Sequence, residues 1–176
     1  MLLSKYRTAE SFALAYNPDL QVKCAENVER SFLGDAPSIA ILKKTYTKNQ
    51  VRVWLMAQLE NLNTYCGTKN KMNADQMMML SDIIMTECYY LKASELLLFF
   101  HQFKAGKYGE LYGSVDPLRV SSALVEFAAY RRDMLFKFES KAQEERRRVE
   151  HEERSKRIMT YDEFKKFKKI NQLINE

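Results

Sequence analysis

Glycine and proline are scarce along this chain, and their scarcity limits the folds that it can adopt. The 176 residues include five glycines and three prolines, where average usage would give roughly 12 and 9. Both residue types disfavour helix interiors, because glycine loses the most backbone entropy on folding and proline lacks an N–H donor. Leu, Met, Glu, Lys and Ala are plentiful, and these residues favour helices. The composition therefore predicts an all-α protein.

Apolar patterning divides the chain into a helical body and a C-terminal appendage. A chain of this length can bury a sizeable core. Apolar residues recur at helical spacing up to Phe138, whereas 13 of the 19 residues from 139 to 157 are charged. We therefore expect a compact helical bundle over residues 1–138, a charged helical arm over 139–159 and a short amphipathic helix over 160–176.

Residues that can cap helices mark several of the expected helix ends. Two amphipathic helices are expected over residues 3–16 and 18–33. Thr47, Asn73 and Ser94 each precede an apolar-periodic segment, and side chains of these types accept hydrogen bonds from the first turn of a helix. We therefore expect three further helices to begin at these residues.

The helix that follows Ser94 is expected to lie at the centre of the body. Its apolar residues cover nearly its whole circumference, and they are Leu96, Leu97, Leu98, Phe99, Phe100 and Phe103. A helix that is apolar all round packs against neighbours on several sides. The helix before it is expected to bury Met78, Leu80, Ile83 and Ile84.

The loop from Gly106 to Gly113 is the first candidate site. Lys104, Lys107, Tyr108 and Tyr112 combine cationic and aromatic side chains, which can bind phosphate or stack on bases. In the alternative interpretation, the glycines form turns and the tyrosines cover the core with only their hydroxyls in water. The pattern GxxxxGK[ST] is absent, so the segment is not a P-loop.

Arg131 and Arg132 form a second candidate contact, to phosphate or to an acidic partner. They are equally compatible with the solvent side of a long helix. The 28 basic and 23 acidic residues give a net charge of +5. This balance allows contact with nucleic acid without indicating it.

No motif predicts catalysis, a metal or a cofactor. His101 and His151 are the only histidines, and neither has a neighbour at zinc-ligand spacing or lies in an HExxH motif. The serines do not assemble into a recognisable Ser-His-Asp arrangement. We therefore expect a protein that is not an enzyme, with no metal and no cofactor.

Cysteine usage and hydropathy predict a cytoplasmic protein. The three cysteines are odd in number and widely spaced, which is typical of reduced thiols in an intracellular compartment. The N-terminus has no apolar segment typical of a signal peptide. No apolar run approaches the ~20 residues that a membrane helix needs, so we expect no membrane association.

The charged arm leaves three interpretations open: a solvated single helix, a coiled-coil strand, or a spacer that presents the last helix. The coiled coil is the weakest, because apolar a and d positions are missing. Thr160 and Glu163 have capping-box spacing at the start of the last helix. Its apolar face, Phe164, Phe167, Ile170 and Leu173, either folds back on the body or docks in a partner's groove.

Part of the chain resembles a family of small helical proteins. The resemblance covers about residues 91–132 and is carried by an apolar ELLLFF helix, a GKYGELYG loop, an Asp-Pro helix start and a later arginine. That family has no established function and is carried by phages and mobile elements of gut anaerobes. The resemblance implies an accessory protein of a mobile element.

Two functions are therefore compatible with the sequence. The first is a non-enzymatic adapter that acts through a protein partner, by means of the Gly106–Gly113 loop and the last helix. The second is a nucleic-acid-associated replication accessory factor, similar to a helicase loader, that binds single strands. The sequence leaves the partner's identity and the oligomeric state open.

Overall fold

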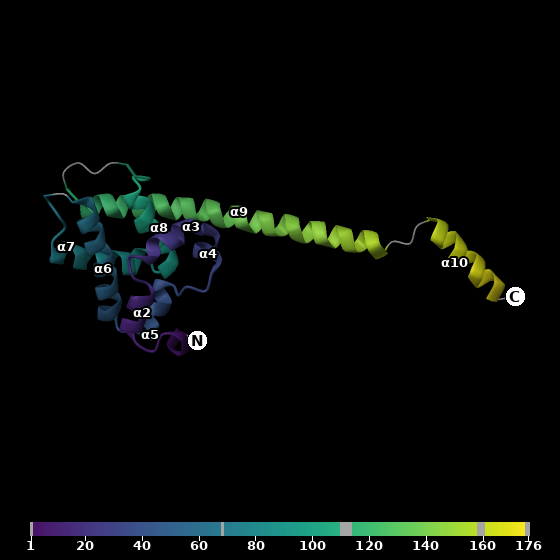
Figure 1. Ribbon diagram of the computed structural model, residues 1–176, viewed down its shortest axis with the longest axis horizontal. Coiled ribbons are helices and arrows are strands. Elements are labelled where there is room, and N and C mark those ends of the chain that lie inside the picture. The colour runs from purple at the N-terminus through teal and green to yellow at the C-terminus, as the bar shows by residue number, and fades with distance from the viewer. Residues whose placement is uncertain (1, 68, 110–113, 158–160, 175–176) are drawn as a thin grey trace. The chain divides into compact units, whose positions relative to one another are not determined.

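The computed structural model describes residues 2–67, 69–109, 114–157 and 161–174 (Figure 1). The regular elements within these ranges are all helices, so the protein is all-α as predicted. They are α1 (Leu2–Lys5), α2 (Ala9–Ala15), α3 (Leu20–Glu26), α4 (Val28–Leu33), α5 (Ile39–Thr45), α6 (Lys48–Cys66), α7 (Ala74–Glu87), α8 (Ala93–Lys104), α9 (Pro117–Arg157) and α10 (Tyr161–Ile174). No helix in the described ranges is long and apolar enough to cross a membrane.

The chain forms two compact units. Unit 1 comprises Met1–Asp133 and contains α1 to α8 with the first part of α9, and unit 2 comprises Met134–Glu176. Unit 1 holds the buried apolar residues, from Phe12 to Phe127. The expected division into 1–138, 139–159 and 160–176 stays a prediction about which segments fold independently.

Helix α8 is the centre of unit 1. It contacts α3, α4 and α6, and its residues from Leu96 to Phe100 are at most 1% exposed. Phe99 also packs against Phe127 of α9, with ring centroids 5.6 Å apart. The prediction of a central helix that is apolar all round is therefore confirmed.

The start of α8 differs from the prediction. Its N-cap is Lys92 rather than Ser94, and a carboxylate oxygen of Glu95 accepts the backbone N–H of Lys92 at 2.8 Å. Ser94 lies within the helix, where its hydroxyl donates to the carbonyl of Ser31 in α4 at 2.7 Å. The Ser94 side chain, which the sequence predicted to cap the helix, thus forms a buried hydrogen bond to α4 instead.

The two helices expected before residue 34 are each broken in two. Thr8 caps α2, and its hydroxyl accepts the backbone N–H of Ser11 at 3.1 Å. Asn27 separates α3 from α4 and accepts the N–H of Arg30 at 3.0 Å. Threonine and asparagine side chains satisfy backbone donors locally, which favours a new helix start over continuation. The predicted uninterrupted helices over 3–16 and 18–33 were therefore wrong.

Helices α6 and α7 begin as predicted, at Thr47 and Asn73. Each side chain caps the first turn, and each is paired reciprocally with a glutamine three residues later. The buried face of α7 is only partly the one that was predicted. Met78 and Ile83 are 40% and 47% exposed, while Met77 and Met85 are buried, so the expectation that the former two are buried was wrong.

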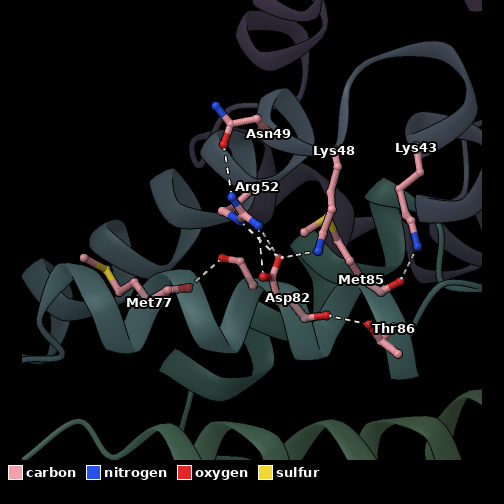
Figure 2. A network of polar contacts seen from close by, with 9 residues as sticks. Lys43, Lys48, Asn49, Arg52, Met77, Asp82, Met85 and Thr86 are labelled. Carbon is pink, nitrogen blue, oxygen red and sulfur yellow. Dashed lines mark hydrogen bonds and ion pairs between the residues drawn. The ribbon is translucent and has the colours of Figure 1, made fainter.

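A set of polar contacts joins α5, α6 and α7 (Figure 2). Arg52 of α6 donates to both carboxylate oxygens of Asp82 in α7 at 2.9 Å, and the ammonium of Lys48 lies 3.5 Å from the same carboxylate. Lys43 of α5 donates to the carbonyl of Met85 at 3.1 Å. We call Arg52, Lys48 and Asp82 the Asp82 clasp.

Unit 2 consists of the remaining part of α9 and of α10. The α9 part carries ion pairs between successive turns, with Arg148 lying 2.7 Å from Glu145 and 3.8 Å from Glu152. Arg154 lies 4.0 Å from Glu150. All five side chains are more than half exposed, so each pair adds little by itself. The charged helix predicted from the sequence is present up to Arg157.

Candidate functional site

Tyr108 of the candidate loop lies in the core of unit 1. It is 5% exposed, and its hydroxyl donates to Oε1 of Gln102 at 2.6 Å. Its ring centroid is 5.6 Å from that of Phe99 and 6.3 Å from that of Phe103. Burial raises the pKa of Tyr108. Tyr108 therefore closes the core, and its ring has no free face for a base; Tyr112 lies outside the described residues.

Lys104 is held by contacts within unit 1. Its Nζ donates to Oε1 of Gln21 at 2.8 Å and to Oδ1 of Asn61, and it lies 5.5 Å from the ring centroid of Tyr65. Burial lowers the pKa of Lys104, and the nearby Cys66 acts to raise it. Lys104 thus joins α8 to α3 and α6, and its contact with phosphate stays a prediction.

Lys107 lies over an aromatic ring of the same unit. Its Nζ is 3.2 Å from the ring centroid of Tyr130 in α9, and it donates to Oε1 of Gln102 at 3.2 Å. Burial lowers the pKa of Lys107. Gly106 and Gly109 have φ angles of 75° and 91°, which glycine adopts without strain. The described loop is therefore a turn that fastens α8 to α9.

Arg131 and Arg132, adjacent in α9, have different surroundings. Nε of Arg131 donates to Oε1 of Glu95 in α8 at 2.9 Å, and the Glu95 side chain is 0% exposed. Burial raises the pKa of Glu95, against the opposing effects of the Lys92 N–H and of Arg131. Arg132 is exposed. Arg131 is thus engaged with α8, and Arg132 is the more accessible residue of this pair.

The last helix presents an apolar face to solvent. Phe164, Phe167 and Ile170 are 54%, 51% and 56% exposed, and we call these three residues the α10 face. They recur every third residue, which places them along one side of the helix. The side chain of Leu173, expected on the same face, lies outside the described part of the chain.

Lysines accompany the α10 face. Lys165, Lys166 and Lys168 are exposed, and Nζ of Lys165 lies 4.7 Å from the ring centroid of Tyr161. The described part of α10 therefore combines three exposed apolar side chains with three exposed lysines. Among the predicted site residues that the structure describes, Phe164, Phe167 and Ile170 are exposed together on one helix.

The α10 face lies within a segment that is shared with other proteins. Residues 71–174, more than half of the chain, match the model of a family of unknown function, DUF6633. The chain belongs to that family. The DUF6633 segment runs from the residues before α7 to the end of α10 and includes the stretch on which the resemblance was based. No curated protein and no solved structure matches the chain.

Sequence reasoning missed a cavity in unit 1 of this DUF6633 protein. The cavity has a volume of about 450 Å³, and Lys5, Lys23 and Arg30 are among its lining residues. These three side chains come from α1, α3 and α4, and no motif or periodicity connects them. No signal in the sequence could therefore have identified them as neighbours.

Proposed function

We propose that the protein is a non-enzymatic adapter that docks α10 in an apolar groove of a protein partner. The exposure of the α10 face carries this proposal. Three large apolar side chains on one side of a helix bury little in unit 2, whereas an amphipathic helix normally gains its stability by burying such a side. Recognition of a helix in a groove uses anchors at this spacing.

The positive charge of α10 predicts the charge of the partner's surface. Lys165, Lys166 and Lys168 border the α10 face, so a groove with an apolar floor and an acidic rim is its complement. Complementary charge at the rim increases the association rate and weakens with added salt. We therefore expect the partner to carry Asp or Glu around the groove.

The charged part of α9 suits a spacer in this proposal. Residues 139–157 carry seven basic and six acidic side chains, and the ion pairs between successive turns support a helix without a packed face. An arm of nearly balanced charge has little affinity for nucleic acid. The resemblance supports an accessory protein of a phage or mobile element, and the separate cysteines support a cytoplasmic location.

The alternative, a replication accessory factor that binds single strands, has less support. Of its predicted contacts, Tyr108 is buried, and Lys104 and Lys107 are engaged within unit 1. Base stacking requires an accessible aromatic face.

The test begins with photo-crosslinking from α10 in cells that contain the protein. The crosslinked protein is then purified, and its affinity for the full chain is measured in solution. We expect the triple variant Phe164→Ala, Phe167→Ala, Ile170→Ala to bind at least tenfold more weakly, since buried apolar anchors dominate such interfaces. Leu118→Ala with Val125→Ala is the matched control, because these side chains are 75% and 73% exposed on α9, and it should bind as the unmodified chain does.

Three results would contradict the adapter proposal. One is equal affinity of the partner for the triple variant and the unmodified chain. Another is binding of the purified chain to vesicles of anionic lipid that the triple variant loses, which would assign the α10 face to a membrane surface. The third is tight single-stranded DNA binding that falls steeply with salt, which would favour the replication factor.

A further inference from the structure

The cavity in unit 1 is large enough for one small organic molecule. Its volume of about 450 Å³ lies within the range of roughly 300–1,000 Å³ typical of ligand sites. It is formed by residues of α1 to α4 and of the segment after α4, together with Ser94 of α8. It uses neither the α10 face nor the Gly106–Gly113 loop, so it is independent of the proposed docking function.

The deep part of the cavity is neutral and polar. Tyr16, Cys24, Ser31 and Ser94 line it and are each at most 8% exposed. The Ser31 hydroxyl donates to the carbonyl of Cys24 at 2.8 Å. Burial raises the pKa of Cys24 and of Tyr16, so both are protonated at neutral pH. No carboxylate is among these deep residues, so nothing there repels an anion.

The outer part of the cavity is basic. Lys5, Lys23 and Arg30 line it and are exposed, and Asp35 is the single carboxylate among the lining residues. In the part of the chain that the structure describes, none of the three cations forms an ion pair. Three cations and one carboxylate give the lining residues a net charge of +2. Such a concentration of positive charge attracts anions.

The geometry points to a binding site for a small phosphorylated molecule, with its phosphate between Lys5, Lys23 and Arg30 and its carbon part in the cavity. Arginine offers paired donors to phosphate oxygens, and lysine offers a compact charge. The rings of Tyr6 and Tyr16, which also line the cavity, supply apolar surface for the rest of the ligand. Asp35 can accept a hydrogen bond from a ligand hydroxyl or amino group.

The test is calorimetric titration of the full chain with inorganic phosphate, glucose 6-phosphate and adenosine monophosphate. These three probes share the phosphate and differ in the attached group, so their affinities separate a bare anion, a sugar and a nucleotide. Adenosine serves as the uncharged reference. We expect saturable binding of one molecule per chain for at least one phosphorylated probe, and binding of adenosine at least tenfold weaker than that of adenosine monophosphate if the nucleotide binds.

Variants that remove one charge each test whether the phosphorylated probes bind at the cavity. Lys23→Gln and Arg30→Gln should each weaken binding about tenfold, as expected for loss of a charge-assisted hydrogen bond. Lys44→Gln and Arg146→Gln remove the same charges from exposed positions that do not line the cavity, and they should leave the affinity unchanged. Thermal unfolding verifies that all four variants fold.

A blocking variant separates a cavity from a merely basic surface. Ala15 lines the cavity and is exposed, so Ala15→Trp fills space there without changing any charge. We expect it to abolish binding while the thermal unfolding midpoint stays close to that of the unmodified chain. The proposal is overturned by an absence of saturable binding to all three phosphorylated probes, by equal losses in the control variants, or by full affinity in Ala15→Trp.

Discussion

Arg131 and Glu95 form a buried ion pair between α8 and α9, and the pair makes a clear prediction for stability. With the Glu95 side chain fully buried and that of Arg131 21% exposed, removal of Arg131 leaves a buried carboxylate without its ion-pair partner, and only Lys92 then offsets its charge. We expect Arg131→Met to lower the free energy of unfolding by about 3 kcal/mol at pH 8. The exposed neighbour provides the control, since Arg132→Met should change stability by less than about 0.5 kcal/mol.

The loss in Arg131→Met should depend on pH in a defined direction. The pKa of Glu95 is already raised in the folded protein, and loss of Arg131 raises it further. The folded state then binds a proton more tightly than the unfolded state, so stability falls as the pH rises from the ordinary glutamate pKa through the raised one. Urea unfolding between pH 4.5 and 8 should show the smallest deficit at the acidic end; a constant deficit would contradict the assignment.

Tyr108 provides a second prediction about a single residue. We expect Tyr108→Ala to lower the free energy of unfolding by about 3 kcal/mol, because it leaves a cavity beside Phe99 and Phe103. Tyr108→Phe keeps the ring and loses only the hydrogen bond to Gln102, which should cost about 1 kcal/mol. Chemical denaturation measures both values. If the two variants were equally stable, the ring would not be packed as described.

The Asp82 clasp connects α6 to α7, and its removal measures how much this connection contributes to stability. Burial acts to raise the pKa of Asp82, but Arg52 and Lys48 outweigh it, and the pKa is lowered overall. Because the Asp82 side chain is 37% exposed, solvent screens the pair, and we expect Asp82→Asn to cost less than about 1 kcal/mol at pH 7. Glu87→Gln, at an exposed position of α7, should show no such loss.

The pH dependence of the clasp is opposite in sign to that of Glu95. A carboxylate with a lowered pKa contributes stability above its ordinary value of 3.8, and this contribution is lost as the pH falls through the lowered value. The difference between the unmodified chain and Asp82→Asn should therefore shrink below about pH 4. Thermal unfolding in acidic buffers measures it, and a difference that grows on acidification would exclude the clasp as its source.

At the scale of the whole molecule, truncation of the chain tests whether unit 1 folds without most of unit 2. The buried apolar residues of the described chain end at Phe127, so a chain that ends after Phe138 retains all of them. We expect it to unfold cooperatively, with a midpoint within about 5 °C of the full chain. It should also lose the partner that the α10 face binds. Circular dichroism and the affinity measurement test the two parts separately, and a truncated chain that does not fold would contradict the division at residue 138.

Much of the helical architecture could be predicted from the sequence, because the relevant interactions are local. Thr47 and Asn73 cap helices with residues three positions away, and the apolar circumference of α8 is contained in one short segment. The apolar side of α10 likewise follows from helical spacing, whereas its exposure does not. Local patterns could not decide the role of the Gly106–Gly113 loop, because the same residue types suit both a binding loop and a packed turn.

The sequence by itself determined the all-α class, the starts of α6 and α7 and the amphipathic character of α10, because each depends on residues within a few positions of one another. Only the tertiary structure decided that Ser94 contacts α4, that Tyr108 is buried, and that Lys5, Lys23 and Arg30 surround one cavity. These outcomes depend on which helices pack together. Side chains that are distant in sequence become neighbours only through that packing, which no local pattern encodes.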